Sequence, residues 1–244
     1  PVSKISDDLI VSNPYFLAPS PTFKKPFDLE IKCGEKDAKI YYTLDGSIPT
    51  ASSALYTNPI TISSTTTVKA IAIKDGKSSF VDQGTFTKIR DDIKLTLLTK
   101  YLPNYPAQGD ETLIDGIRGT QNWRLGRWQG YQGNDLVAVI DMGAVKPVKT
   151  VSLGTLQDSQ SWVVFPKYVE YWTSDDNKNY KLAATVKTET GIEDIDIQTQ
   201  EFKASLNTTT RYIKIIAKQY GTMPESHPDK GKPSYIFADE ITIE

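Results

Sequence analysis

Pairs of adjacent carboxylates are the first feature of this sequence that could do chemistry. Hydrolysis of a glycosidic bond needs two carboxyl groups that converge on one substrate. Candidate pairs include Asp91-Asp92, Asp175-Asp176, Glu193-Asp194 and Asp239-Glu240. The last pair lies in a segment with a strand pattern, where successive side chains point to opposite faces, so it is not expected to converge. The second pair is interpreted as a hairpin turn and the third as a solvated strand or loop edge.

Other catalytic arrangements are excluded by residue type and length. The chain has one Cys (Cys33) and one His (His227), which removes Cys/His zinc sites and an internal disulfide framework. A (β/α)₈ barrel needs about 250 residues of alternating strands and helices. Nucleophile-elbow, P-loop and dinucleotide fingerprints are absent from the sequence. We therefore expect no catalytic domain in this chain.

Three polar loop segments combine aromatic rings with hydrogen-bonding groups, at residues 126–134, 157–162 and 221–232. Sugars present flat C–H patches and a rim of hydroxyls, so a sugar site needs an aromatic face and a few polar partners. If the fold brings these loops to one end, Trp162 or Trp128 would stack on the sugar ring. The hydroxyls would then be bound by Gln129, Asp158, Arg118 and His227.

Each of these residues also has a structural interpretation. Trp128 fits a core position as well as a site, whereas Trp162 fits the site better because its neighbours are polar. Trp123 and Trp172 are interpreted as packing residues. His227 by itself would be an ordinary loop residue, and only the neighbouring groups make it a candidate ligand.

Strand patterns position these loops. Short segments rich in Val, Ile, Thr and Tyr are separated by Asp-Gly, Pro and Ser/Thr/Asn clusters, without helical spacing of apolar residues. The net charge is −2 with both signs spread along the chain, so no nucleic acid partner is expected. No apolar stretch is long enough for a transmembrane segment. The sequence predicts an all-β protein.

A length of 244 residues favours two compact units. Residues 1–21 contain several prolines and few alternating apolar positions, so they are predicted to form an extended lead-in or linker. The charged run 88–92 interrupts the strand pattern, and the boundary is placed there. The predicted domains are residues 22–90 and 91–244.

The first predicted domain contains three distinctive segments: Ile40-Tyr-Tyr-Thr-Leu-Asp-Gly-Ser-Ile-Pro-Thr50, Leu55-Tyr-Thr-Asn-Pro-Ile60 and Thr66-Thr-Val-Lys-Ala-Ile-Ala72. They resemble the small β-sandwich that follows the catalytic barrel in bacterial chitobiases and β-N-acetylhexosaminidases. The resemblance implies a small immunoglobulin-like β-sandwich. In physical terms, Asp45-Gly46 makes a tight turn, and the Tyr and Ile positions fill a thin core between two sheets.

The second predicted domain carries its own series of motifs over residues 110–244. They include Leu113-Ile-Asp-Gly116, Trp128-Gln-Gly-Tyr131, Ala138-Val-Ile-Asp-Met-Gly143, Arg211-Tyr-Ile-Lys214 and Phe237-Ala-Asp-Glu-Ile241. This series resembles the discoidin-like domain, also called coagulation factor type C and classed as carbohydrate-binding module family 32. The resemblance implies a jelly-roll β-sandwich. Together, the two domains resemble the tail of family 20 glycoside hydrolases.

The resemblance to the discoidin-like family implies a structural calcium ion. Carried over to this sequence, the family pattern gives side-chain oxygens from Asp115, Thr120 and Glu240, and backbone carbonyls from Thr112, Ile117 and Asp239. Such a set of hard oxygens suits Ca²⁺ better than Mg²⁺. The family often has Asn or Asp where this chain has Ile117, but that position would use its carbonyl. The alternative is an ordinary turn at Asp115-Gly116 with Glu240 solvated.

The resemblance implies a non-catalytic tail of an exported bacterial glycoside hydrolase, a β-N-acetylhexosaminidase, located in the periplasm, at the cell surface or outside the cell. The expected partners are a glycan that ends in a galactose- or N-acetylhexosamine-type sugar, and an N-terminal catalytic barrel on the same polypeptide. Because the sequence starts at Pro1 without Met or a signal peptide, it is expected to be a piece of a longer protein. Two alternatives stay open: an adhesion or protein-interaction module, and a structural tail that packs on the barrel.

Overall fold

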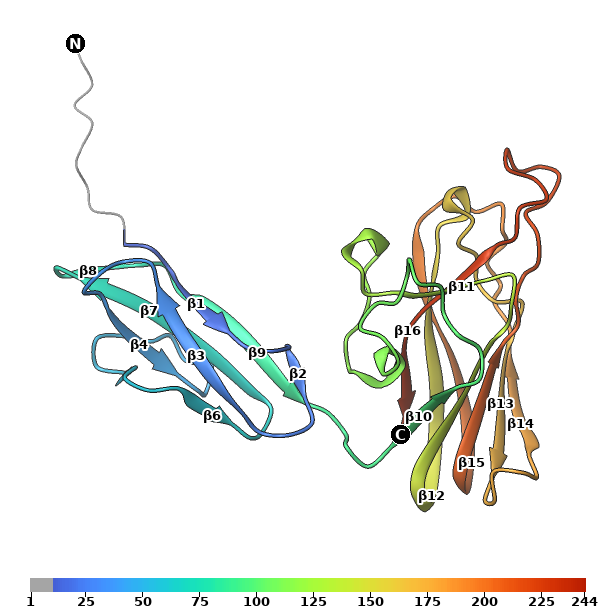
Figure 1. The fold of residues 1–244 in the computed structure, drawn as a ribbon, viewed down its shortest axis with the longest axis horizontal. Coiled ribbons are helices and arrows are strands. Elements are labelled where there is room, and N and C mark those ends of the chain that lie inside the picture. The colour runs from blue at the N-terminus through green and yellow to red at the C-terminus, as the bar shows by residue number, and fades with distance from the viewer. Residues whose placement is uncertain (1–10) are drawn as a thin grey trace, which may run out of the picture. The chain divides into compact units, whose positions relative to one another are not determined.

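The computed structural model describes residues 11–244, and the chain divides into two compact units between Ile89 and Arg90 (Figure 1). Apart from three single-turn 3₁₀ helices, the regular structure of the described residues consists of strands, which confirms the all-β prediction. No helix within residues 11–244 is long and apolar enough to cross a membrane.

The first unit is a small sandwich of two sheets. One sheet has the order β1-β3-β6, and the other has the order β2-β9-β7-β4-β5 with β8 paired to β7. Leu29 and Ile31 of one sheet and Val68 and Ala70 of the other are almost completely buried and form the core between the sheets. The strands are β1 (Pro14–Leu17), β2 (Thr22–Phe23), β3 (Phe27–Cys33), β4 (Lys39–Thr43), β5 (Ala54–Leu55), β6 (Ile60–Ile62), β7 (Thr66–Lys74), β8 (Lys77–Ser78) and β9 (Asp82–Lys88).

Part of the predicted lead-in belongs to this unit. Residues 14–17 form β1, which pairs with β3, and Phe16 packs against the core next to Phe86. The expectation of an extended linker over residues 1–21 is therefore corrected for this stretch; its residues 1–10 lie outside the described part of the chain. Prolines limit regular structure only where their missing N–H is needed, and Pro14 opens a strand at the edge of its sheet.

The second unit is a sandwich built from seven strands in the order β11-β16-β12-β15-β13-β14, with β10 paired to β12. Its elements are β10 (Lys94–Leu97), η1 (Thr112–Ile114), η2 (Trp123–Leu125), β11 (Gln129–Gln132), β12 (Leu136–Gln157), η3 (Ser159–Ser161), β13 (Val169–Ser174), β14 (Lys181–Val186), β15 (Gln198–Ala217) and β16 (Tyr235–Ile243).

Two long strands, β12 and β15, connect the two layers of this sandwich. Their pairing shifts register between residues 141 and 146 and again between 148 and 150 of β12. Such irregularities bend a strand. The first half of β12 pairs with β10 and the end of β15, and the second half pairs with β16 and the start of β15. Each long strand therefore contributes to both layers.

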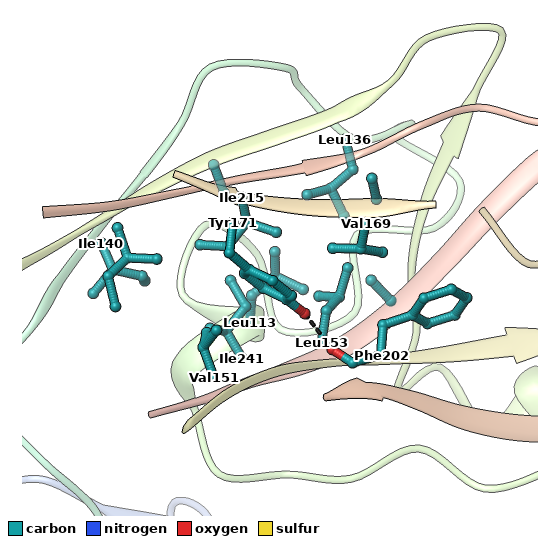
Figure 2. Packing of buried hydrophobic residues seen from close by; sticks show 14 of the residues in the cluster. Leu113, Leu136, Ile140, Val151, Leu153, Val169, Tyr171, Phe202, Ile215 and Ile241 are labelled. Carbon is teal, nitrogen blue, oxygen red and sulfur yellow. Dashed lines mark hydrogen bonds between the residues drawn. The ribbon is translucent and has the colours of Figure 1, made fainter. Parts of the chain in front are cut away.

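The core lies between these layers. Figure 2 shows Tyr171 of β13 among Leu113, Leu153 and Ile241, with its hydroxyl directed at the carbonyl of Phe202 on β15, to which it donates a hydrogen bond. Tyr171 is almost completely buried, and this desolvation raises the pKa of its hydroxyl far above the ordinary value. The apolar core thus holds the two layers of the sandwich together, and the loops at its ends are available to form a binding site.

Candidate functional site

Two of the three predicted loop segments meet at one end of the second unit, where η3 and the loop before β16 lie in Figure 1. The Trp162 indole Nε1 donates to Asp229 Oδ2 at 3.0 Å, and the backbone of Tyr235 donates to the Trp162 carbonyl at 2.7 Å. The third segment reaches this end through Gln132 Nε2, which donates to the carbonyl of Pro233 at 3.0 Å. Hydrogen bonds therefore link the three segments, or residues directly after them, at this end, which is the condition that the sugar-site hypothesis sets.

A cleft of about 510 Å³ opens between residues 159–160, 192–195 and 224–229. One part of its wall is apolar and consists of Ile192, Ile195, Pro224 and Pro228. Ile195 keeps 62% of its surface exposed. An apolar wall with a few polar groups at its rim is the usual form of a small-ligand site.

The polar rim of the cleft includes Gln160, Glu193, Ser226 and His227. Nδ1 of His227 accepts a hydrogen bond from the backbone N–H of Asp229 at 3.0 Å. In the neutral imidazole the proton then sits on Nε2, which is a donor. The rim therefore offers donors and acceptors of the kind that sugar hydroxyls need.

Asp229 also lines the cleft, but its carboxylate is engaged. It accepts from Trp162 Nε1 and forms an ion pair with Lys232 at 2.7 Å. The hydrogen bonds from Lys232 and Trp162 lower the pKa of Asp229. This residue fixes the loop around His227 and leaves ligand binding to its neighbours.

Ile192, Glu193 and Ile195 line the cleft, although residues 193–196 were interpreted from the sequence only as a solvated strand or loop edge. Gln157 Nε2 donates to the carbonyl of Gly191 at 2.9 Å, and Ser159 Oγ donates to the carbonyl of Asp194 at 2.9 Å. These bonds hold Ile192 and Glu193 against η3. The available signal was the alternation of isoleucines with acidic residues in a loop, because exposed isoleucine is costly without a partner surface.

Trp162 lies beside the cleft rather than in its wall. Its backbone has a positive φ of 63° at the end of η3. The indole stacks on Tyr235 with ring centroids 6.5 Å apart, and Lys232 Nζ lies 4.1 Å from the indole centroid. Because its Nε1 and one side of its ring are engaged by the 221–235 loop, Trp162 positions that loop.

Trp128 is a core residue, and its assignment as a stacking platform is corrected. Its side chain is 2% exposed and packs with Leu156, Val163 and Phe237. Its Nε1 donates to the carbonyl of Thr120 at 2.9 Å. The ring also fills the space in front of Gly119, where a Cβ would lie 2.2 Å from the indole. A buried ring has no face to offer a sugar.

Gln129 and Asp158 are also buried, which corrects their assignment to sugar hydroxyls. Gln129 Nε2 donates to the carbonyl of Gly109 at 2.8 Å, and its oxygen accepts from the Tyr131 hydroxyl. Asp158 Oδ2 accepts from Trp123 Nε1 at 2.9 Å. Both residues satisfy buried donors and acceptors between loops.

Arg118 lines a separate hollow of about 230 Å³ together with Glu201 and Asp239. It forms ion pairs with Glu201 at 2.6 Å and with Asp239 at 3.3 Å. Asp239 also accepts from the backbone N–H of Gly119 at 2.9 Å, and burial raises its pKa. Of the six predicted sugar ligands, only His227 lines the cleft, and Trp162 borders it.

The predicted calcium ligands lie partly together. Glu240 Oε2 accepts from the backbone N–H of Gly116 at 2.9 Å, and Asp115 Oδ1 accepts from that of Ile117 at 2.8 Å. The Thr112 carbonyl accepts from Asp115 N at 3.4 Å. Thr120 is exposed and its hydroxyl is 3.5 Å from the Asn122 carbonyl. Within residues 11–244, no three acidic, His or Cys side chains gather as a metal cluster.

The side chains of Asp239 and Glu240 depart from the alternation that a regular strand predicts. β12 and β16 pair Leu153 with Ile241 but Thr155 with Ala238, so two residues of β16 face Gly154. This bulge breaks the alternation. Both carboxylates therefore accept from the same loop, at Gly119 and Gly116. Burial, followed by repulsion from Asp115 and Asp239, raises the pKa of Glu240 to about 8.

Comparison with known families matches both units. The F5/8 type C domain model matches residues 98–227, which is more than half of the chain, and the chitobiase/beta-hexosaminidase C-terminal domain model matches residues 18–82. These matches confirm the two resemblances. A comparison with the curated proteins finds no match.

Several solved structures are similar over the same region. CpGH89CBM32-6 from Clostridium perfringens is 11% identical, covering 64% of this chain and 94% of its own, with a TM-score of 0.36. The C-terminal domain of a chitobiase from Bacteroides fragilis is 15% identical, covering 63% and 93%, with a TM-score of 0.36. A CBM32 domain in complex with 4,5-unsaturated mannuronic acid is 18% identical, covering 64% and 97%, with a TM-score of 0.39.

Proposed function

The chain belongs to the F5/8 type C domain family, and on that basis we propose that its second unit binds a glycan in the cleft between residues 159–160, 192–195 and 224–229. Both matched domains are non-catalytic accessory domains, and the second is of the carbohydrate-binding kind. The observation that carries the proposal is the apolar wall of this cleft beside the imidazole of His227.

The ligand of this cleft is a terminal galactose- or N-acetylhexosamine-type sugar. Its C–H patches pack on Ile192 and Ile195, and its hydroxyls bond to the rim. The parent protein is an exported glycoside hydrolase, of the β-N-acetylhexosaminidase type, whose catalytic barrel is on the same polypeptide. The role of this region is to keep that enzyme near its glycan, which raises the local concentration of substrate.

Removal of the imidazole tests the location of this site. His227→Ala is expected to weaken binding about tenfold on a glycan array and in titration, because one ligand hydrogen bond is lost. Trp162→Ala is expected to weaken binding less, about threefold, because the indole holds Asp229 rather than the ligand. Glu225→Ala is the control, since Glu225 lies in the same loop without lining the cleft. If His227→Ala binds the glycan as well as the wild type does, the glycan site is not in this cleft.

We further propose that a structural calcium ion binds between the 112–120 loop and β16. Asp115 and Glu240 both lie next to Gly116, and the carbonyls of Thr112, Ile117 and Asp239 together with Thr120 complete the proposed set of oxygens. Two carboxylates with neutral oxygens fit the oxygen preference of Ca²⁺. When bound, the ion would neutralise these carboxylates and tie the loop to the last strand.

Calorimetry of EDTA-treated protein tests the calcium proposal. With Ca²⁺ at a thousand times its Kd, stability is expected to rise by about 4 kcal/mol, which is roughly 8–16 °C in Tm for a unit of this size. Glu240→Gln should reduce this gain, whereas Asp110→Asn should retain it because Asp110 is in an exposed pair with Lys100. Absence of Ca²⁺ binding and of any rise in Tm would disprove the proposal.

A packing role for the first unit is the second candidate function, and an exposed apolar row favours it. Half-buried Tyr41 pairs with Leu55 and with the buried Ile71, on the face opposite to the core residues Ile40 and Tyr42. Leu55 is 46% exposed, and Phe80, in the loop before β9, is 83% exposed. Such a surface suits contact with another domain. If the chain binds no glycan in the array above, this is the function that remains.

A further inference from the structure

We infer that the cleft selects its glycan by charge: it binds neutral and amino sugars and excludes sugars that carry a carboxylate, such as uronic and sialic acids. This inference rests on the proposed glycan site, whose specificity it defines. It is based on the acidic residues Glu193 and Asp229, which line the cleft, and on Lys230 and Lys232, which do not.

The charged groups of the cleft wall are acidic. Within the described residues, Glu193 and Asp229 line the cleft, and no Lys or Arg does. The lysines of the neighbouring loop are engaged elsewhere: Lys232 pairs with Asp229, and Lys230 pairs with Glu225 at 2.9 Å. Strong recognition of a sugar carboxylate uses a cation, which is Arg, Lys or protonated His. This cleft has no Arg or Lys, and the neutral imidazole of His227 offers a donor without a positive charge.

Glu193 is the carboxylate that meets a ligand. Its side chain is exposed, and within residues 11–244 it makes no hydrogen bond or ion pair. Asp229, in contrast, is neutralised by Lys232 and bonded by Trp162. A carboxylate only accepts hydrogen bonds, so Glu193 can bind a hydroxyl or an ammonium group but repels a second carboxylate.

The aliphatic wall of the cleft makes the charge of Glu193 more important for the choice of sugar. Among residues 11–244, no Phe, Tyr or Trp lines the cleft, whose apolar surface comes from Ile192, Ile195, Pro224 and Pro228. Stacking on an aromatic face would supply affinity that is insensitive to ligand charge. Without it, the orientation of the sugar depends on the polar rim, and the rim carries one unpaired negative charge.

The size of the effect follows from Coulomb repulsion. Two unit charges about 5 Å apart in a solvent-exposed site repel enough to weaken binding about fivefold to fifteenfold. This repulsion is screened by salt, because the Debye length falls from about 30 Å at 0.01 M to about 3 Å at 1 M. A steric exclusion of the same ligand would not depend on salt.

The experiment is an NMR titration of the whole chain with matched methyl glycosides. The galactose series comprises galactose, galactosamine, N-acetylgalactosamine and galacturonic acid, and the glucose series comprises the corresponding four sugars. At low salt, a neutral sugar and the amine of one series should bind. The uronate of the same series should bind at least about fivefold more weakly than that neutral sugar. In 1 M NaCl the difference should fall to about twofold or less.

Glu193→Gln is expected to remove the discrimination at low salt while the neutral sugar binds as before. Glu225→Gln is the matched control: it removes an acidic charge from the neighbouring loop, outside the cleft, and should leave the discrimination unchanged. Equal binding of the uronate and the neutral sugar by the wild type, or discrimination that persists in Glu193→Gln and in high salt, overturns the inference. If no sugar of either series binds, the proposed function itself fails.

Discussion

Replacement of Trp128 by alanine is expected to lower the free energy of unfolding of the second unit by about 3–5 kcal/mol, since it removes a large buried side chain and leaves a cavity. The cavity would lie between Leu156, Val163 and Phe237, which pack against the indole. The change also leaves the Thr120 carbonyl without its donor. The surrounding strands limit collapse of the cavity, because Phe237 and Leu156 are themselves in paired strands.

Urea unfolding followed by circular dichroism measures this loss, and Trp162→Ala is the matched comparison. Trp162 is the same residue type at a half-buried position, so its truncation should cost only about 1–2 kcal/mol. A larger loss of unfolding free energy in Trp128→Ala than in Trp162→Ala is the expected result. A folded Trp128→Ala protein of nearly wild-type stability that no longer binds glycan would restore Trp128 to the site and contradict its assignment to the core.

Alanine at position 154 is expected to destabilise the second unit by about 3 kcal/mol, because the added methyl group overpacks the ion pair between the buried Asp239 and the exposed Arg118. A Cβ at Gly154 would lie 2.1 Å from Asp239 Oδ1 and 2.5 Å from Arg118 Nη1. Asp239 is buried and also accepts from Gly119 N, so it has little room to move.

Thermal and urea unfolding of Gly154→Ala test this expectation, with Gly34→Ala as control. A Cβ at Gly34 would meet no atom within 4 Å, so this substitution should change stability by no more than about 1 kcal/mol. The contribution of each contact is checked by Arg118→Ala: in this background Gly154→Ala should cost somewhat less, because the contact with the guanidinium is gone while the closer contact with Asp239 Oδ1 remains. Equal losses in both backgrounds would assign the strain to Asp239 alone.

Local signals were sufficient for the strands and for the loop segments. The motif 66–72 was predicted to belong to a small β-sandwich, and it lies in β7. The motif 138–143 was predicted to belong to a jelly-roll β-sandwich, and it lies in β12. The polar composition of the segments around Trp162 and His227 predicted loops, and both lie outside the long strands. Each of these features depends on residue types within one short stretch.

Individual side chains were harder to predict. Trp128, Gln129 and Asp158 have the residue types of a sugar site but are buried, and each bonds to at least one group that is 8 to 35 residues away. The alternation rule also gave the wrong directions for Asp239 and Glu240, because a bulge opposite Gly154 interrupts it. Long-range packing decides which polar residue faces solvent and which satisfies a buried partner.

By itself, the sequence determined the all-β architecture and the set of loops from which a site could be built, because the period of apolar residues and the turn residues act locally. The two families of domain followed from the resemblance of its motifs to those of known families. Only the tertiary structure decided that Ile192, Glu193 and Ile195 complete the cleft, that Trp162 supports the loop of His227, and that Glu193 supplies the unpaired charge. The physical reason is that a cleft is a property of surfaces brought together by distant strands, and no local pattern specifies which faces of those loops remain exposed.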